Sequence, residues 1–257
     1  MDLRNLAKIT IDFLLPRYCS VCGKRLHISE KGICVGCLMD LHLADCADGH
    51  KGNTLERTMW LKMPIERAGA FLLYDRDNSQ RRIVLDLKYH NRPKLGLHMA
   101  ALMVERLNTT DFFDSIDLII PIPISKRRQI QRGYNQSLQI AKGISKQTHI
   151  PIDTHTVTRR HYSTSQTKLS PTERLNNVVN TFVLHPNNLQ NKHVLIIDDV
   201  ITTTATVMGC AKVLSTIPGI RISVLALAVS RRLINNMRAN NPQGEEPQEP
   251  LDHDDTL

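Results

Sequence analysis

Aromatic side chains are scarce in this chain. Phenylalanine, tryptophan and tyrosine together make up 4% of its 257 residues, and there is a single tryptophan. Proteins that bind single-stranded nucleic acid use aromatic rings as stacking platforms for the bases, so the shortage counts against binding mainly by stacking. Long hydrophobic runs are also absent, since none approaches the roughly 18 to 20 apolar residues of a spanning helix. The sequence therefore predicts no membrane insertion.

Lysine and arginine are missing from the last part of the chain. Six acidic residues and no basic ones follow Arg238, so a net charge of +8 for the whole chain becomes +14 for residues 1–238. The positive charge of residues 1–238 attracts polyanions, either nucleic acid or a phosphorylated small molecule, over a Debye length of roughly 8 Å. The alternative, for any one of these charges, is a solubilising role on the surface.

Residues 239–257 have too little apolar content to fold, so we expect a disordered acidic tail. This tail either competes with anionic ligands for the basic body or keeps the protein soluble. At the other end, the apolar residues of 3–15 are broken by Lys8 and Asp12, and no small-residue cleavage site follows. That pattern favours an amphipathic helix over a signal peptide, and we expect a cytoplasmic location.

Four of the six cysteines form two closely spaced pairs, Cys19 with Cys22 and Cys34 with Cys37. Four thiolates bind zinc tetrahedrally, and each pair can present both sulfurs to one ion. Disulfides are the alternative, but they require an oxidising compartment, for which there is no export signal. The sequence predicts a structural Zn²⁺ site in a small, zinc-ribbon-like module. With sulfur at all four positions, catalysis at this metal is not expected.

A buried strand followed by two carboxylates and a hydroxyl-rich turn is the most informative pattern. Residues 194–197 are consecutive aliphatic residues, as in a strand covered on both faces of a parallel sheet. Asp198 and Asp199 follow, and adjacent carboxylates suit the vicinal hydroxyls of a ribose. The next residues open a helix, whose free N–H groups and dipole favour a phosphate. The candidates for this phosphate turn are Thr202, Thr203, Thr204, Ala205 and Thr206. The alternative is a strand and helix entry without a ligand.

The thirteen residues from Val194 to Thr206 resemble the phosphoribosyl-pyrophosphate (PRPP) signature of type I phosphoribosyltransferases. The resemblance implies that Asp198 and Asp199 hold the ribose hydroxyls and that the threonine-rich turn holds the 5-phosphate. It also implies Mg²⁺ bound with PRPP, because this ion neutralises the leaving pyrophosphate. In that family the turn usually reads Thr-Thr-Gly-Ala-Thr, and here Thr204 replaces the glycine. A Cβ at this position is expected to restrict φ or to crowd the phosphate.

Apolar periodicity predicts alternating strands and helices in the middle of the chain. The expected strands are 68–74, 117–123 and 152–157, and the expected helices are 83–89, 98–107 and 137–146. This alternation predicts an α/β fold with a parallel sheet flanked by helices, and the resemblance of residues 194–206 implies that the fold is type I phosphoribosyltransferase-like. We expect three parts: residues 1–60 as an N-terminal helix and zinc module, 61–238 as the α/β domain, and 239–257 as the acidic tail.

A basic segment follows the expected second strand. Residues 126–132 contain four cations within seven positions, in a strand-to-helix loop of the kind where doubly wound sheets bind anions. Arg128, Arg132, Gly133 and Asn135 are candidates to clamp a pyrophosphate. The alternative is a solvated basic loop.

Residues 159–177 form a long polar segment between two expected strands of the same sheet edge. A loop of this kind can close as a lid over a bound sugar phosphate. Gln166, Lys168 and Arg174 are the candidates for contacts in the closed state. An ordinary irregular connection is the alternative.

Together with the Lys88-Tyr89 pair, the basic segment, the polar loop and the acidic turn resemble the ComF/GntX family over nearly the whole chain. Members of that family resemble phosphoribosyltransferases fused to a four-cysteine zinc finger. Many are associated with natural transformation, the uptake of DNA as a single strand into the cytoplasm. The resemblance implies Lys88 and Tyr89 as further ligand contacts. It also implies single-stranded DNA and other competence proteins as partners.

Taken with these motifs, the resemblance implies a cytoplasmic PRPP-binding protein that handles imported single-stranded DNA. Two alternatives remain: an active phosphoribosyltransferase of nucleotide metabolism or salvage, and a non-catalytic PRPP sensor. No residue stands out as a general base, so Asp198 and Asp199 are the only candidates for a catalytic role.

Overall fold

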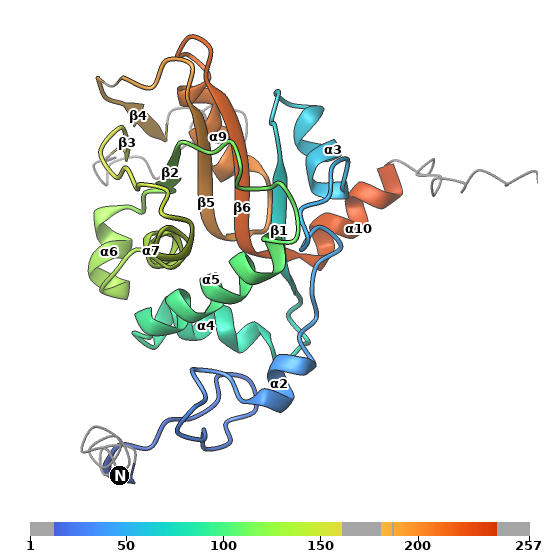
Figure 1. Cartoon of the computed structure of the whole chain (residues 1–257), viewed down its shortest axis with the longest axis vertical. Helices are drawn as coiled ribbons and strands as arrows, with labels where there is room; N and C mark the ends of the chain where they lie inside the picture. The colour runs from blue at the N-terminus through green and yellow to red at the C-terminus, as the bar shows by residue number, and fades with distance from the viewer. Residues whose placement is uncertain (1–12, 161–180, 187, 241–257) are drawn as a thin grey trace, which may run out of the picture.

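A four-stranded parallel sheet lies at the centre of the molecule (Figure 1). The structure is a computed structural model of the chain that describes residues 13–160, 181–186 and 188–240. The sheet has the order β1-β6-β5-β2, and every neighbouring pair is parallel. Its strands are β1 (Ala68–Tyr74), β2 (Leu118–Pro121), β5 (His193–Ile201) and β6 (Arg221–Ser230). A separate antiparallel pair consists of β3 (Val157–Arg159) and β4 (Phe182–Leu184).

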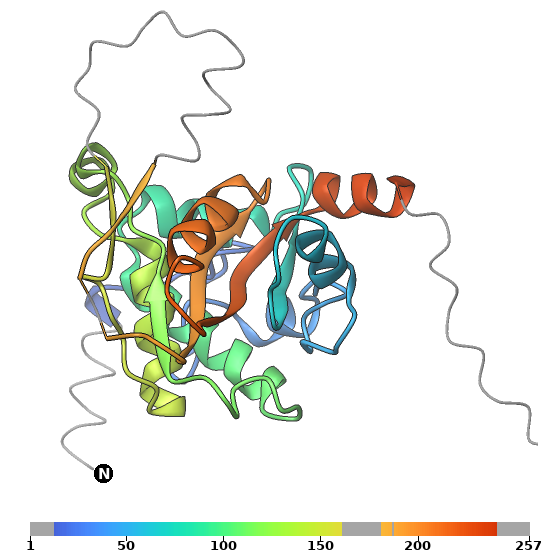
Figure 2. The ribbon, with the colours of Figure 1, turned by 90° about the horizontal axis from the view of Figure 1, so that it is seen from above.

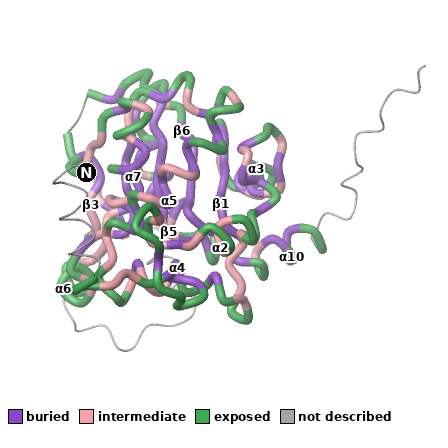
Figure 3. Tube along the Cα trace, turned by 60° about the horizontal axis from the view of Figure 1, so that its bottom comes forward, coloured by how far each residue is buried: buried purple, intermediate pink, exposed green. Residues whose placement is uncertain are grey.

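Helices cover both faces of the sheet (Figures 1 and 2). One face carries α4 (Arg81–Tyr89), α5 (Pro93–Leu107) and α7 (Gln136–Thr148), and the other carries α3 (Thr54–Trp60), α9 (Ala205–Leu214) and α10 (Arg231–Asn240). Successive side chains of a strand point to opposite faces, so Leu195 packs in the first core and Ile196 in the second. Burial on both faces makes the central strands continuously buried (Figure 3). The predicted α/β fold with a helix-flanked parallel sheet is confirmed.

The alternation of side chains between the two faces of the sheet is interrupted at one row of residues. Phe71, Asp199 and Leu227 occupy this row, and the described pairing between their strands skips it while continuing on both sides. At the same row two successive side chains enter one core, as Leu227 and Ala228 do on β6. The side chain of Asp199 therefore does not follow the regular alternation of the β5 side chains between the two faces, just before this strand ends.

The N-terminal segment packs beneath α4 and α5 (Figure 1). It includes one short helix, α2 (Val35–Met39), and its Leu26 is buried in the same core as Leu95 of α5. Arg92 donates a hydrogen bond of 3.0 Å to the Ser20 hydroxyl from the turn between α4 and α5. Gly32 has a φ of +73°, and a Cβ there would lie 2.7 Å from Leu95 Cδ1. Glycine is thus required where this segment meets α5.

The expected basic loop contains a helix, α6 (Lys126–Arg132), which corrects the sequence prediction. The Ser125 hydroxyl accepts a hydrogen bond from Arg128 N at 3.3 Å and caps the first turn. Gly133 ends the helix with a φ of +78°. None of its residues is buried, so the helix has no apolar periodicity by which a sequence pattern could reveal it.

The expected strand over 152–157 is also corrected. Ile152 makes only an isolated bridge to Ile119, and β3 begins at Val157. Asp153 Oδ1 accepts hydrogen bonds from the backbone N–H groups of His155 and Thr156, at 2.6 and 3.0 Å. This side chain therefore forms a turn in the middle of the expected strand.

The polar segment 159–177 connects β3 and β4, which form their own antiparallel pair instead of an edge of the parallel sheet. Its candidate contacts Gln166, Lys168 and Arg174 lie outside the described residues. Within the described residues, no helix has both the length and the apolar composition needed to cross a membrane.

Candidate functional site

The acidic pair lies at the carboxyl end of β5, where α7 and α4 also meet it. Asp198 Oδ1 accepts hydrogen bonds from Asp199 N at 2.8 Å and from the Ser137 hydroxyl of α7 at 3.4 Å. The Asp199 carboxylate lies 3.4 Å from the ammonium of Lys88, in the last turn of α4. Both side chains of this ion pair are mostly buried. Two of the sequence candidates, Lys88 and Asp199, are thus brought together.

The surroundings of Asp198 oppose its negative charge. Burial raises the pKa of this carboxyl to about 8, and the neighbouring charge of Asp199 adds to the effect. The N–H of Asp199, the ammonium of Lys88 and the hydroxyl of Ser137 offset the pKa shift only in part. In the ligand-free protein Asp198 therefore holds a proton near neutral pH, and it can donate a hydrogen bond as well as accept one.

The turn after β5 presents an open helix N-terminus beside the acidic pair. β5 ends at Ile201 and α9 begins at Ala205, and the side chains of Thr202, Thr203 and Ala205 are exposed. Thr206 is half-buried in the first turn of α9. The first N–H groups of a helix have no partner within it, so this turn offers donors to an anion.

Thr204 departs from the usual glycine without straining the backbone. Its φ is −72° and its ψ is −7°, a right-handed conformation open to any residue, so the expected restriction of φ is wrong. Its side chain is 2% exposed, and its hydroxyl accepts a hydrogen bond from the ammonium of Lys62. The side chain is thus directed away from the exposed side of the turn.

Lys62 was missed by the sequence analysis. It lies 142 positions from Thr204, in the segment after α3, and nothing in the local pattern marks it. Ser137 was likewise missed, because it falls inside a predicted helix and a lone serine carries no signal. Both contacts exist only in the folded chain.

Of the candidates around α6, Asn135 and Arg132 make contacts within the fold, whereas Arg128 is exposed. Asn135 caps α7 through a 3.4 Å hydrogen bond from Leu138 N and donates to the carbonyl oxygen of Ile122 at 3.0 Å. Arg132 stacks over the ring of Tyr89 with its Cζ 5.7 Å from the centroid. The Arg128 side chain is exposed, and its guanidinium has no hydrogen-bond or ion-pair partner among the described residues.

The four predicted cysteine ligands converge in the N-terminal segment. The Sγ atoms of Cys19, Cys22, Cys34 and Cys37 all lie within 4.8 Å of one another. The distance between Sγ of Cys22 and Sγ of Cys34 is 3.7 Å. Sulfurs bound tetrahedrally at a zinc–sulfur distance of about 2.3 Å lie about 3.8 Å apart, so the cluster has the size of a zinc site.

Backbone groups favour the thiolate form of Cys19. Its Sγ accepts hydrogen bonds of 3.4 Å from the backbone N–H groups of Val21 and Cys34. Burial opposes the charged form, but the backbone donors outweigh it and lower the pKa of Cys19 to about 7. Since zinc binds thiolates, these donors fit the predicted structural metal.

Comparisons with known proteins identify relatives over much of the chain, although no protein-family model matches it. Competence protein F of Haemophilus influenzae is 28% identical over 226 residues, which cover 82% of this chain and 96% of that protein. DNA utilization protein YhgH of Escherichia coli K12 is 31% identical over 135 residues, covering 51% of this chain and 59% of YhgH. Competence protein ComFC of Bacillus subtilis is 32% identical over 97 residues, 38% of either chain.

Solved structures of similar topology are more distant. A hypothetical protein from Neisseria gonorrhoeae with bound ppGpp aligns at 17% identity and a TM-score of 0.35, covering 52% of this chain and 66% of that chain. Hypoxanthine-guanine phosphoribosyl transferase of L. donovani aligns at 11% identity and a TM-score of 0.37, covering 56% and 77%.

Proposed function

Since this chain is a homologue of competence proteins F and ComFC and of the DNA utilization protein YhgH, we propose that it binds PRPP and handles imported single-stranded DNA. In this proposal it acts in the cytoplasm during natural transformation. The names of the relatives support the link to DNA uptake. One observation carries the PRPP site: the Asp198–Asp199 pair lies directly before the open turn at the start of α9.

In the proposed site, the acidic pair and the turn before α9 bind different parts of PRPP. The ribose hydroxyls donate to the carboxyl groups of Asp198 and Asp199, and Asp198 loses its proton when the ligand binds. The 5-phosphate binds the N–H groups and hydroxyls of residues 202–206. Lys88 holds the Asp199 carboxylate in place through its 3.4 Å ion pair.

Cations complete the proposed site. Mg²⁺, bound together with PRPP, would neutralise the pyrophosphate, and oxygen ligands of the kind that it prefers are present at Asp198 and Asp199. Arg128 supports a pyrophosphate contact, because its exposed guanidinium has no partner among the residues that the structure describes. A structural Zn²⁺ held by the four cysteines has a separate task, which is to shape the N-terminal module.

Calorimetric titration of the zinc-loaded full chain with PRPP, with and without Mg²⁺, tests the proposal. We expect saturable binding that the double substitution Asp198→Asn and Asp199→Asn abolishes, because the ribose then loses both carboxyl groups. A matched control is Glu105→Gln with Asp114→Asn, which removes two exposed acidic groups elsewhere. Affinity retained in the first variant, or no binding by the parent protein, refutes the assignment.

Two further measurements in the same samples sharpen the result. Thr204→Gly is expected to bind PRPP within about tenfold of the parent, about 1.4 kcal/mol, because the parent backbone is already unstrained there. A gain well beyond tenfold would instead mean that the Thr204 side chain blocks the phosphate. Release of pyrophosphate on addition of acceptor bases distinguishes a working transferase from a protein that only binds PRPP.

A further inference from the structure

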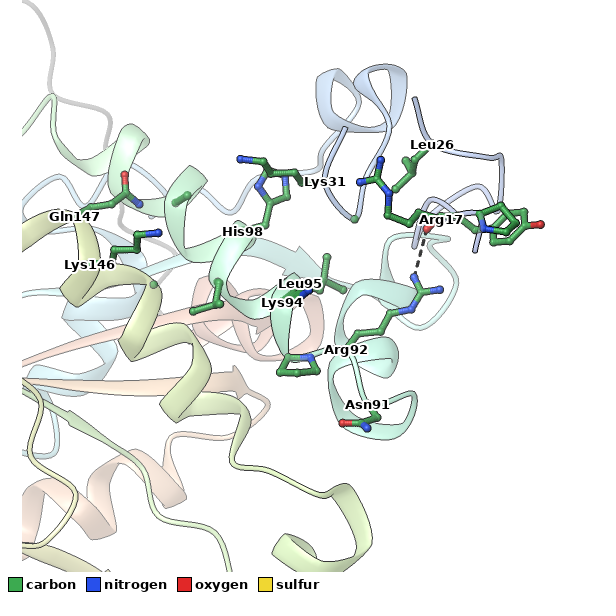
Figure 4. A pocket seen from close by; sticks show the side chains of 17 residues that line it. Arg17, Leu26, Lys31, Asn91, Arg92, Lys94, Leu95, His98, Lys146 and Gln147 are labelled. Carbon is green, nitrogen blue, oxygen red and sulfur yellow. Dashed lines mark hydrogen bonds between the residues drawn. The ribbon is translucent and has the colours of Figure 1, made fainter. Parts of the chain in front are cut away.

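A cavity of about 910 Å³ lies between the N-terminal module and the helices α5 and α7 (Figure 4). Its lining residues include five lysines and arginines and no acidic residue. The cations are Arg17, Lys31, Arg92, Lys94 and Lys146. They come from the module, from the turn before α5, from α5 itself and from α7. We call this cavity the module groove.

The two arginines of the module groove are engaged in contacts within its walls. Arg17 donates hydrogen bonds to three carbonyl oxygens of the module, including that of Glu30 at 2.7 Å. Arg92 pairs with Asp86 at 3.0 Å and donates to the Ser20 hydroxyl at the same distance. The Arg92 contacts join the module to α4 and to the turn before α5, whereas the Arg17 contacts stay within the module.

The three lysines, in contrast, are free to bind a ligand. Lys31, Lys94 and Lys146 are exposed, and no hydrogen-bond or ion-pair partner of their ammonium groups occurs in the described part of the chain. They surround the groove from three different elements (Figure 4). Unpaired cations held around one cavity form a favourable place for several phosphates.

The floor of the groove is apolar. Pro93, Leu95, Leu97 and Ala101 of α5 line it, and Leu97 is 36% exposed. The module adds Tyr18, whose side chain is 47% exposed. Single strands bind in grooves that combine cations for the backbone with apolar or aromatic surfaces for the bases. A duplex keeps its bases paired and presents mainly phosphates and groove edges, so it gains little from an apolar floor.

We propose that the module groove binds single-stranded nucleic acid, with phosphates on Lys31, Lys94 and Lys146 and bases against Leu97 and Tyr18. The proposal rests on the proposed function only in taking imported DNA as the source of the strand. The groove is distinct from the PRPP site, since neither Asp198 nor Asp199 lines it. Along α7, Lys146 lies nine residues beyond Ser137, a distance of about 14 Å.

Fluorescence anisotropy with a labelled single-stranded oligonucleotide tests this site in the full, zinc-loaded chain. The variant K31Q/K94Q/K146Q is expected to lose at least about tenfold in affinity. The slope of log affinity against log salt should fall by about two, since three phosphate contacts each contribute about 0.7 for a single strand. The matched control K51Q/K192Q/K212Q removes the same charge from exposed lysines outside the groove and should bind nearly as the parent does.

The outcomes separate this inference from the proposed function. The Asp198→Asn and Asp199→Asn variant is expected to keep its affinity for the oligonucleotide. If both lysine variants lose the same affinity, or if a duplex binds as tightly as the single strand, the groove is not the site proposed here. If the parent protein does not bind PRPP but K31Q/K94Q/K146Q still weakens binding of the oligonucleotide, only the PRPP site is rejected. Circular dichroism and zinc content check that the variants are folded.

Discussion

At the scale of the residue, Asp198 couples ligand binding to a proton. Its carboxyl group is buried beneath α7 and lies next to another carboxylate, and both features favour the protonated form. Hydroxyl donors or a cation at the same edge would favour the charged form instead. A ligand that uses this carboxylate therefore has to remove its proton, and binding is expected to release protons near neutral pH.

The proton on Asp198 also predicts how stability depends on pH. The folded-state pKa of about 8 lies above the ordinary value of 3.8, so between these pH values the folded chain binds more protons than the unfolded chain. The contribution of this group to the free energy of unfolding then falls as pH rises, by at most about 1.4 kcal/mol per pH unit. We expect Asp198→Asn to stabilise the ligand-free protein, and by more at pH 8 than at a pH of about 5.

Urea unfolding of the parent and the Asp198→Asn variant at the two pH values measures this difference. Asp114→Asn provides the control, because it changes the same group at an exposed position. A stability difference between parent and variant that does not change with pH would contradict a protonated Asp198.

The residues of the candidate site differ in how far the sequence could predict them. The acidic pair, the threonines and the four cysteines are each close together in sequence, so spacing alone was enough to propose them. Their burial was not predictable, because Asp198 is covered by Ser137 of α7, which lies 61 positions away. The turn at Thr204 was misjudged for a similar reason: its conformation and its Lys62 contact depend on the whole fold.

At the scale of the element, the zinc module and α5 form one packing unit. Cys19, Val21 and Leu26 belong to the same hydrophobic core as Leu95 and Met99. The module has little secondary structure of its own, with α2 as its one named helix in the described part. Its order therefore depends on the metal and on the surface of α5 together.

Replacement of two ligands tests this dependence. Cys34→Ser with Cys37→Ser is expected to remove zinc and to unfold the module, because two sulfurs do not hold the ion in place. Hydrogen exchange should then become faster in residues 17–39 and in α5, while the central strands β5 and β6 stay protected. Met39→Ser is the control, since this side chain lies in the same module and is 82% exposed. Full zinc content in the double variant would contradict the assigned ligands.

Elements with a strong apolar pattern were predicted close to their bounds, except that α5 begins at Pro93 instead of residue 98. Elements held by local hydrogen bonds were not predicted. β1 has the predicted bounds, and α4 and α7 lie within two residues of theirs. α6 was missed because it buries nothing and is held by its caps at Ser125 and Gly133. β3 was placed too early because the Asp153 turn interrupts an otherwise strand-like segment.

At the scale of the whole molecule, one buried arginine joins segments that are far apart in sequence. Arg67 Nη1 lies 2.7 Å from Asp111 Oδ1, and Arg67 Nη2 donates to the carbonyl oxygen of Gly49 at 2.5 Å. Its Nε lies 3.6 Å from the fully buried carboxylate of Glu56 on α3. Glu56 also accepts a hydrogen bond from Ala68 N at the start of β1. This network fixes α3 and the loop after α5 to the first strand.

We expect Arg67→Met to lower the free energy of unfolding by about 3 to 5 kcal/mol, because the substitution leaves the Glu56 carboxylate buried without its cation. Urea unfolding monitored by circular dichroism measures the change. Arg221→Met is the matched control: its ion pair with Glu66 is exposed and long, at 3.9 Å, so the loss should stay within about 1 kcal/mol. Equal effects of the two substitutions would contradict a structural role for the buried pair.

The strand order sets when the fold can be completed during synthesis. β6 is the last strand among the residues that the structure describes, yet it lies between β1 and β5. The other edge of β1 meets no strand of the described sheet, but only the isolated bridge between Leu43 and Leu72. β1 therefore cannot pair with its strand neighbour until β6 is made, and until residue 230 has emerged one edge of β1 and the inner edge of β5 both present unpaired backbone groups. The zinc ligands are complete at Cys37, so metal capture can come early, whereas the central sheet is completed late, when β6 pairs with β1 and β5.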